Sequence, residues 1–130
     1  MLAVADVAGF LSGLGITAPV LSLEDVVAQK PAMQHVIAVP TGGPRMLLER
    51  LIDVPTFQLR SVGLQRDYAS AETLAGQVDS ALLAVRPPAT IAGRPLTVVD
   101  RVGGPPSFFA RDSAGRTVFV CNYLFEVAAT

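Results

Sequence analysis

The sequence contains one cysteine, one histidine and no tryptophan. A single cysteine, Cys121, cannot form a disulfide within the chain, which excludes the small secreted folds that depend on disulfides. A zinc site built from thiolate and imidazole ligands needs several such residues, and only His35 is there to accompany Cys121. The fold must therefore be held together by its hydrophobic core.

Charge is also scarce. Charged residues make up 16% of the chain, against about 25% in an average protein. There are 10 basic and 11 acidic residues, and the basic residues form no run. Because the electrostatic surface of a DNA-binding domain is missing, binding to nucleic acid as the main activity is excluded.

Long apolar runs are missing too. None approaches the roughly 18–20 residues of a membrane-spanning helix. Residues 1–6 lack the basic start of a signal peptide, and the apolar stretch that follows is interrupted by glycine and serine. We therefore expect no membrane segment and a reducing, aqueous compartment.

What the sequence does have is apolar side chains, which make up 51% of its 130 residues. This length suits a single domain that spans residues 1–130. So small a domain with so little charge has apolar surface left over. The simplest use for that surface is contact with other subunits.

Helical spacing of apolar residues predicts two helices, and a capping pattern indicates a third. Residues 5–14 form a short amphipathic helix that we expect Asp6 to cap, and residues 67–85 form a helix of about five turns. Asp67 is a suitable N-cap for the longer helix, and its apolar stripe begins at Tyr68. A second short helix is expected to open at Ser22.

Alternating apolar residues predict the strands. These are residues 34–39 and 56–63 before the long helix and residues 96–102, 107–111 and 116–127 after it, the last three as an antiparallel meander. Residues 45–53 fit either a helical turn or the start of a long strand. The predicted fold is α+β, a mixed, mostly antiparallel sheet with the long helix and the short N-terminal helix packed on one face.

No common catalytic arrangement can be assembled from these residues. His35 lies inside a predicted strand, and Cys121 lies in the middle of the last one, so both are interpreted as buried structural residues. The glycine-rich turns lack the lysine of a phosphate-binding loop. We therefore predict no catalytic, metal-binding or cofactor-binding residues, no cofactor, and a protein that is not an enzyme.

Two apolar segments are better explained as contact surface. One lies between the two central strands and the other at the mouth of the last hairpin. Each could belong to the core by itself, but both together are hard to bury in one small domain. The candidate oligomer or partner interface consists of Leu47, Leu48, Leu51, Ile52, Pro105, Pro106, Phe108 and Phe109.

Several segments resemble the tail-terminator proteins of long-tailed bacteriophages, a family also described as minor capsid or tail-completion proteins. The resemblance rests on residues 57–61 (FQLRS), 67–75 (DYASAETLA), 82–83 (LL), 106–116 (PSFFARDSAGR) and 123–127 (YLFEV). It extends from about residue 34 to the end of the chain. It carries no catalytic signature.

This resemblance implies a virion protein of the tail or neck, assembled in the host cytoplasm. Such a protein forms a ring, usually of six subunits, that caps the tail tube, ends its polymerisation and joins the head. The implied partners are further copies of the chain, the major tail-tube protein and a head-tail connector or stopper protein, with DNA only passing through the lumen. Four arginines are candidates for contacts between subunits or for lining the lumen, with solvated strand ends as the alternative: Arg60, Arg101, Arg111 and Arg116.

Three alternatives stay open at this point. Within the phage interpretation, a head-completion or connector protein is the nearest. Outside it, the chain could be a small ligand-binding or regulatory α+β module. A small hydrolase or transferase is the least favoured, because the catalytic arrangements are missing.

Overall fold

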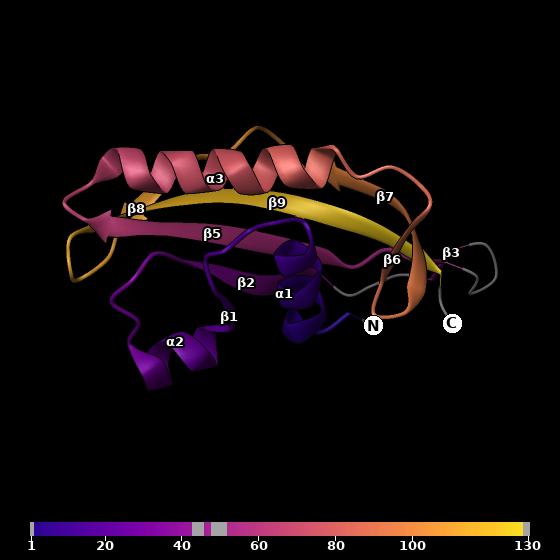
Figure 1. Cartoon of the computed structure of the whole chain (residues 1–130), viewed down its shortest axis with the longest axis horizontal. Coiled ribbons are helices and arrows are strands. Elements are labelled where there is room, and N and C mark those ends of the chain that lie inside the picture. The colour runs from indigo at the N-terminus through magenta and orange to yellow at the C-terminus, as the bar shows by residue number, and fades with distance from the viewer. Residues whose placement is uncertain (1, 43–45, 48–51, 129–130) are drawn as a thin grey trace.

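The structure is a computed structural model that describes residues 2–42, 46–47 and 52–128. Across these ranges, nine strands form one sheet and three helices pack against it (Figure 1). The fold is α+β, as the sequence predicts. The elements in chain order are α1 (Val4–Gly13), β1 (Val20–Leu21), α2 (Leu23–Gln29), β2 (His35–Gly42), β3 (Met46–Leu47), β4 (Ile52–Asp53), β5 (Thr56–Gln65), α3 (Tyr68–Leu83), β6 (Ala89–Ile91), β7 (Arg94–Arg101), β8 (Ser107–Arg111) and β9 (Arg116–Ala128).

Helix α3 lies along the sheet and provides much of the core. Its N-cap is Asp67, whose carboxylate accepts a hydrogen bond from the Ser70 amide at 3.1 Å. The predicted cap and apolar stripe are thus confirmed, except that Tyr68 is 46% exposed. The buried residues of the helix are Ala71, Leu74, Ala75, Val78, Asp79 and Leu82.

Helix α1 covers the same face of the sheet beside β2. Its Val7 and Leu11 join Leu82 of α3 in one apolar cluster with the sheet. Asp6 does not cap this helix as predicted. The N-cap is Ala3, and the Asp6 carboxylate, one turn inside the helix, accepts from the Ala3 amide at 2.8 Å.

Helix α2 lies on the opposite face of the sheet, at one end only. Ser22 caps it, since its hydroxyl accepts from the Asp25 amide at 3.1 Å. Its Val26 packs against Ile37, Val62 and Val118. Beyond this small cluster, α2 leaves much of that sheet face uncovered.

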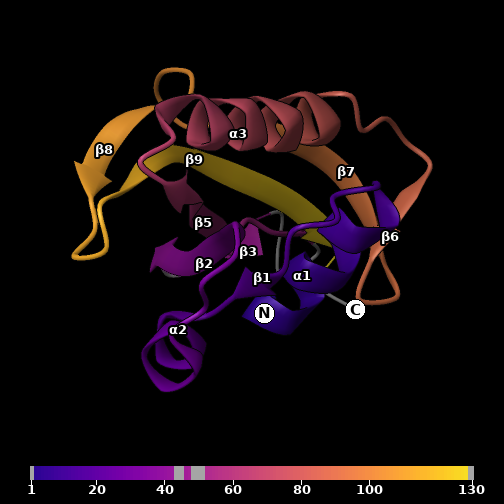
Figure 2. The same ribbon diagram turned by 60° about the vertical axis from the view of Figure 1, so that its left-hand side comes forward.

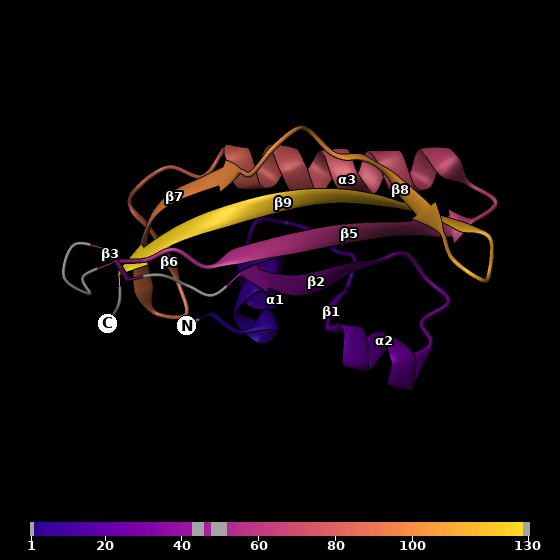
Figure 3. The same ribbon diagram turned by 180° about the vertical axis from the view of Figure 1, so that it is seen from behind.

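Strand β9 is the centre of the sheet. It pairs with β4 and β5 along one side and with β7 and β8 along the other. Strands β7 and β8 do not pair with each other but follow one another along β9 (Figure 3). The first connection of the expected meander is therefore wrong, because residues 102–106 carry the chain along β9 instead of turning it back. The expected hairpin between β8 and β9 is confirmed.

Two further parts of the sheet differ from the sequence interpretation. Strand β6 was not expected, and it pairs with β7 through a tight turn at Ala92 and Gly93, both of which have positive φ. The segment of residues 45–53 is neither a helical turn nor a long strand where it is described. It contains the two-residue strands β3 and β4, which pair with each other.

The core lies between the sheet and helices α1 and α3. The alternating residues of β9 that were expected to face it are all buried: Phe119, Cys121, Tyr123, Phe125 and Val127. Phe125 packs edge-on against Phe57 of β5, with ring centroids 5.9 Å apart. No helix in the described ranges is long and apolar enough to cross a membrane.

Candidate functional site

Strand β8 is an open edge of the sheet. Among the described strands it pairs only with β9, so its other side has no strand partner. Phe108 and Phe109 are 51% and 48% exposed on it. Figure 2 shows β8 projecting at one side of the molecule. Natural proteins usually blunt such an edge, because it offers unpaired backbone groups to other chains.

Phe108 lies on the face of the sheet that carries α3. Its ring stacks on that of Tyr68 at 6.3 Å between centroids, with 22° between the planes. Tyr68 in turn meets the buried Phe119 edge-on at 5.2 Å. Tyr68 thus extends the aromatic surface of the edge strand onto the first turn of the helix.

Phe109 lies on the opposite face of the sheet. Its ring covers the guanidinium group of Arg60, which is 5.1 Å from the ring centroid. The Arg60 Nε donates to the Gln58 side-chain oxygen at 2.7 Å, so two contacts orient this arginine beside the ring. We call Tyr68, Phe108 and Phe109 the edge aromatic group.

The other residues of the predicted interface are placed less fully. Pro105 is exposed and Pro106 half-buried, directly before β8. Ile52 is half-buried in β4. Leu48, Leu51 and the side chain of Leu47 lie outside the described residues, so the first predicted patch stays a prediction.

Arg101 is engaged inside the subunit. Its guanidinium forms an ion pair with Asp79 of α3, to which Nε donates at 2.8 Å. The Tyr123 hydroxyl donates to the same carboxylate, also at 2.8 Å. The hydrogen bond from Arg101, more than any other cause, holds the pKa of Asp79 below its ordinary value, and burial raises the pKa of Tyr123. This buried contact fastens α3 to β7 and β9.

Arg116 is also engaged within the chain. Its Nε donates to the Asp112 carboxylate at 2.8 Å across the β8–β9 turn, and its Nη1 donates to the Pro31 carbonyl oxygen. Arg111 is exposed on β8. Of the four candidate arginines, Arg60 therefore lies at the edge aromatic group and Arg111 is exposed on the same strand as Phe108 and Phe109, whereas Arg101 and Arg116 hold elements of the fold together.

The histidine and the cysteine are both buried. His35 Nδ1 is 2.9 Å from the Met33 carbonyl oxygen, and burial is the main reason that the pKa of His35 is lowered. The Cys121 thiol donates to the Gly104 carbonyl oxygen at 3.6 Å, and burial raises its pKa. Neither group is presented to a substrate.

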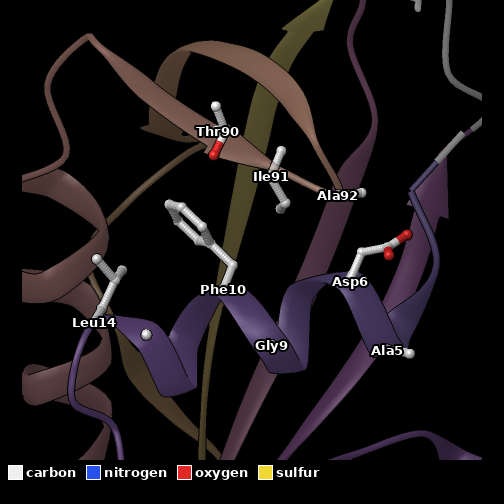
Figure 4. A pocket seen from close by; sticks show the side chains of 9 residues that line it. Ala5, Asp6, Gly9, Phe10, Leu14, Thr90, Ile91 and Ala92 are labelled. Carbon is white, nitrogen blue, oxygen red and sulfur yellow. The ribbon is translucent and has the colours of Figure 1, made fainter.

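A pocket that sequence patterns did not indicate lies between α1 and β6 (Figure 4). Its volume is about 470 Å³. Phe10 extends from α1 toward Thr90 and Ile91, and Leu14 lies beyond Phe10 toward the end of the helix. Asp6 and Thr90 provide its polar side chains. We call it the α1–β6 pocket; its lining is Ala5, Asp6, Gly9, Phe10, Gly13, Leu14, Thr90, Ile91 and Ala92.

Within the described ranges, no group of three or more histidine, cysteine, aspartate or glutamate side chains could hold a metal ion. The chain matches no protein-family model and no curated protein.

Proposed function

We propose that this protein is a structural subunit that acts by assembling with copies of itself into a ring, as a tail terminator of a long-tailed bacteriophage. In this role the ring caps the tail tube, stops its polymerisation and offers a surface to the head-tail connector. The role requires protein contacts and no cofactor. It also gives a use to the apolar surface that a small, weakly charged domain cannot bury.

The observation that carries the proposal is the edge aromatic group on the open side of β8. Each of its three side chains is about half exposed. Aromatic residues are enriched at protein interfaces because each buries a large area. An edge strand that carries them on both faces is a site where a second chain can pack.

The resemblance to tail terminators supports the same function. Its residues 106–116 include all of β8 and the turn to β9. The stretch of residues 67–75 forms the first half of α3, which includes Tyr68. Two of the resembling stretches thus meet at the edge aromatic group.

Assembly and capping test the proposal together. We expect light scattering and electron microscopy of the concentrated protein to show ring-shaped particles, alone or with the tail-tube protein of the same phage. Adding the protein to polymerising tube protein should shorten the tubes. A monomer that leaves tube length unchanged would disprove the proposed function.

A second candidate function, a small ligand-binding module, is favoured by the α1–β6 pocket alone. Its volume falls within the range of about 300–1,000 Å³ that is usual for ligand sites, and its lining is mostly apolar. A small molecule that stays bound in native mass spectrometry and is lost on filling the pocket would support this alternative.

A further inference from the structure

We propose that the two exposed features join successive copies of the chain: Phe109 of one copy inserts into the α1–β6 pocket of the next. This inference rests on the proposed ring and assigns its contact surfaces. The occupant of the pocket is thus a second copy of the chain, and the contact joins two different patches.

The positions of the two features suit such a contact. Strand β8 lies at one end of the molecule and β6 at the other, in both Figure 1 and Figure 3. One copy can therefore offer its aromatic edge to one neighbour while its pocket receives the edge of another. A contact between unlike patches produces a ring when the rotation between copies closes.

The pocket can accept a bulky side chain because part of its wall is formed by glycines, which have no side chain. A Cβ atom built at Gly9 or Gly13 of α1 would meet no atom within 4 Å, so both glycines border open space. Phe10 and Leu14 flank these positions, and the buried Ile91 closes the far side. The resulting volume of about 470 Å³ is large enough for a phenyl ring.

The charges of the two surfaces are complementary. The Arg60 guanidinium lies over the Phe109 ring, Arg111 is exposed on β8, and β8 contains no acidic residue. The pocket contains Asp6 and no basic residue. Asp6 accepts one hydrogen bond from the Ala3 amide, and a carboxylate has further acceptor sites for an incoming guanidinium.

Filling the pocket separates assembly from folding. Gly9→Leu replaces a glycine inside a helix, at a position where an added Cβ atom would meet no atom within 4 Å, so the variant should fold at least as well as the natural chain. We expect it to raise the dissociation constant of the assembly by at least about 30-fold, the size of a strong interface effect. Ala28→Leu on the exposed side of α2 adds similar apolar bulk elsewhere and should leave assembly unchanged.

The complementary variant removes the inserted ring. The substitution Phe109→Ser should weaken assembly to the same extent, with circular dichroism showing that the fold is retained. Mixing this variant with Gly9→Leu leaves one intact edge and one intact pocket. Native mass spectrometry should then show one-to-one heterodimers and no rings.

Each outcome bears on a different step. If the natural chain forms rings and Gly9→Leu forms them equally well, the pocket is not the acceptor and this inference is wrong while the ring remains. If the pocket instead holds a small molecule that Gly9→Leu displaces, with assembly unchanged, the inference is likewise wrong. If copies associate through the two surfaces but do not cap tubes, the contact stands and the proposed function fails.

Discussion

Aromatic rings occur in two contrasting regions of this protein. Phe57, Tyr123 and Phe125 form an interior group that is at most 1% exposed, whereas the edge aromatic group is 46–51% exposed. Each interior residue lies on β5 or β9 and points to the side covered by helices. The edge residues lie where β8 has a strand partner on one side only and where α3 begins.

The contrast shows that position in the sheet, more than residue type, decides what an aromatic side chain does. Successive residues of a strand point to opposite faces. A pair such as Phe108 and Phe109 therefore cannot enter the same core. In addition, a β-bulge between Phe108 and Ala110 interrupts the regular pairing of β8 with β9 at these residues. We infer that the interior rings stabilise the fold and that the edge rings are available to other chains.

The largest expected effect is the difference in stability when a phenylalanine is replaced by alanine in the interior group and in the edge aromatic group. Phe125→Ala should lower the free energy of unfolding by about 3–5 kcal/mol, because it leaves a cavity beside Phe57. Phe109→Ala should lower it by less than about 1 kcal/mol, since the ring is half exposed. Urea denaturation of both variants measures the difference. Similar losses in both would show that the edge ring is part of the core.

An intermediate effect is expected from removing one hydroxyl. Tyr123→Phe deletes the hydrogen bond that Tyr123 donates to Asp79 and should cost about 1–2 kcal/mol of stability. Tyr68→Phe at the exposed edge is the matched control and should change stability by less than about 0.5 kcal/mol. Equal decreases in melting temperature for the two variants would contradict the distinction between the interior group and the edge aromatic group.

The smallest expected effect is a dependence of stability on pH, which arises from the interior of the protein alone. Burial lowers the pKa of His35 from its ordinary 6.5, so below pH 6.5 the unfolded chain binds more protons than the folded one. The free energy of unfolding should therefore have its full value above pH 6.5. It should decrease as the pH drops toward the lowered pKa, by at most about 1.4 kcal/mol per pH unit.

Comparison with His35→Gln checks this dependence. The sequence has no second histidine, and Asp79, whose pKa is lowered from 3.8, contributes its own loss of stability only in stronger acid. Urea denaturation between pH 7 and pH 5 should show a slope in the natural chain and a nearly flat line in the variant. A slope that persists in the variant would assign the titration to another group.

Much of the fold follows from local patterns that are legible in the sequence. The period of α3, its Asp67 cap and the alternation along β9 all predict the observed elements. The order of strands does not follow in the same way, because it depends on pairing between distant residues. Nothing local distinguishes a turn between β7 and β8 from a connection that continues along β9, and β6 is too short to show an alternation.

The candidate site was partly predictable. Phe108 and Phe109 are adjacent apolar residues in a five-residue strand, which is itself a sign of exposure. Tyr68 has the spacing of the buried stripe, yet it lies at the first position of α3, half exposed, and contacts both the exposed Phe108 and the buried Phe119. The contact between Asp79 and Arg101 joins residues 22 positions apart and leaves no periodic signal. The α1–β6 pocket forms only when segments from both halves of the chain meet.

The central place of β9 has a consequence for how the protein folds during synthesis. Strands β5 and β7 each lack one of their two neighbours, and β8 lacks its one strand partner among the described strands, until residues 116–128 have left the ribosome. Pairings between such distant residues form slowly, because a long loop must close first. Until then one edge of β5 and the aromatic residues of β8 stay exposed together, and we expect nascent chains that stop before β9 to be bound by chaperones or to aggregate.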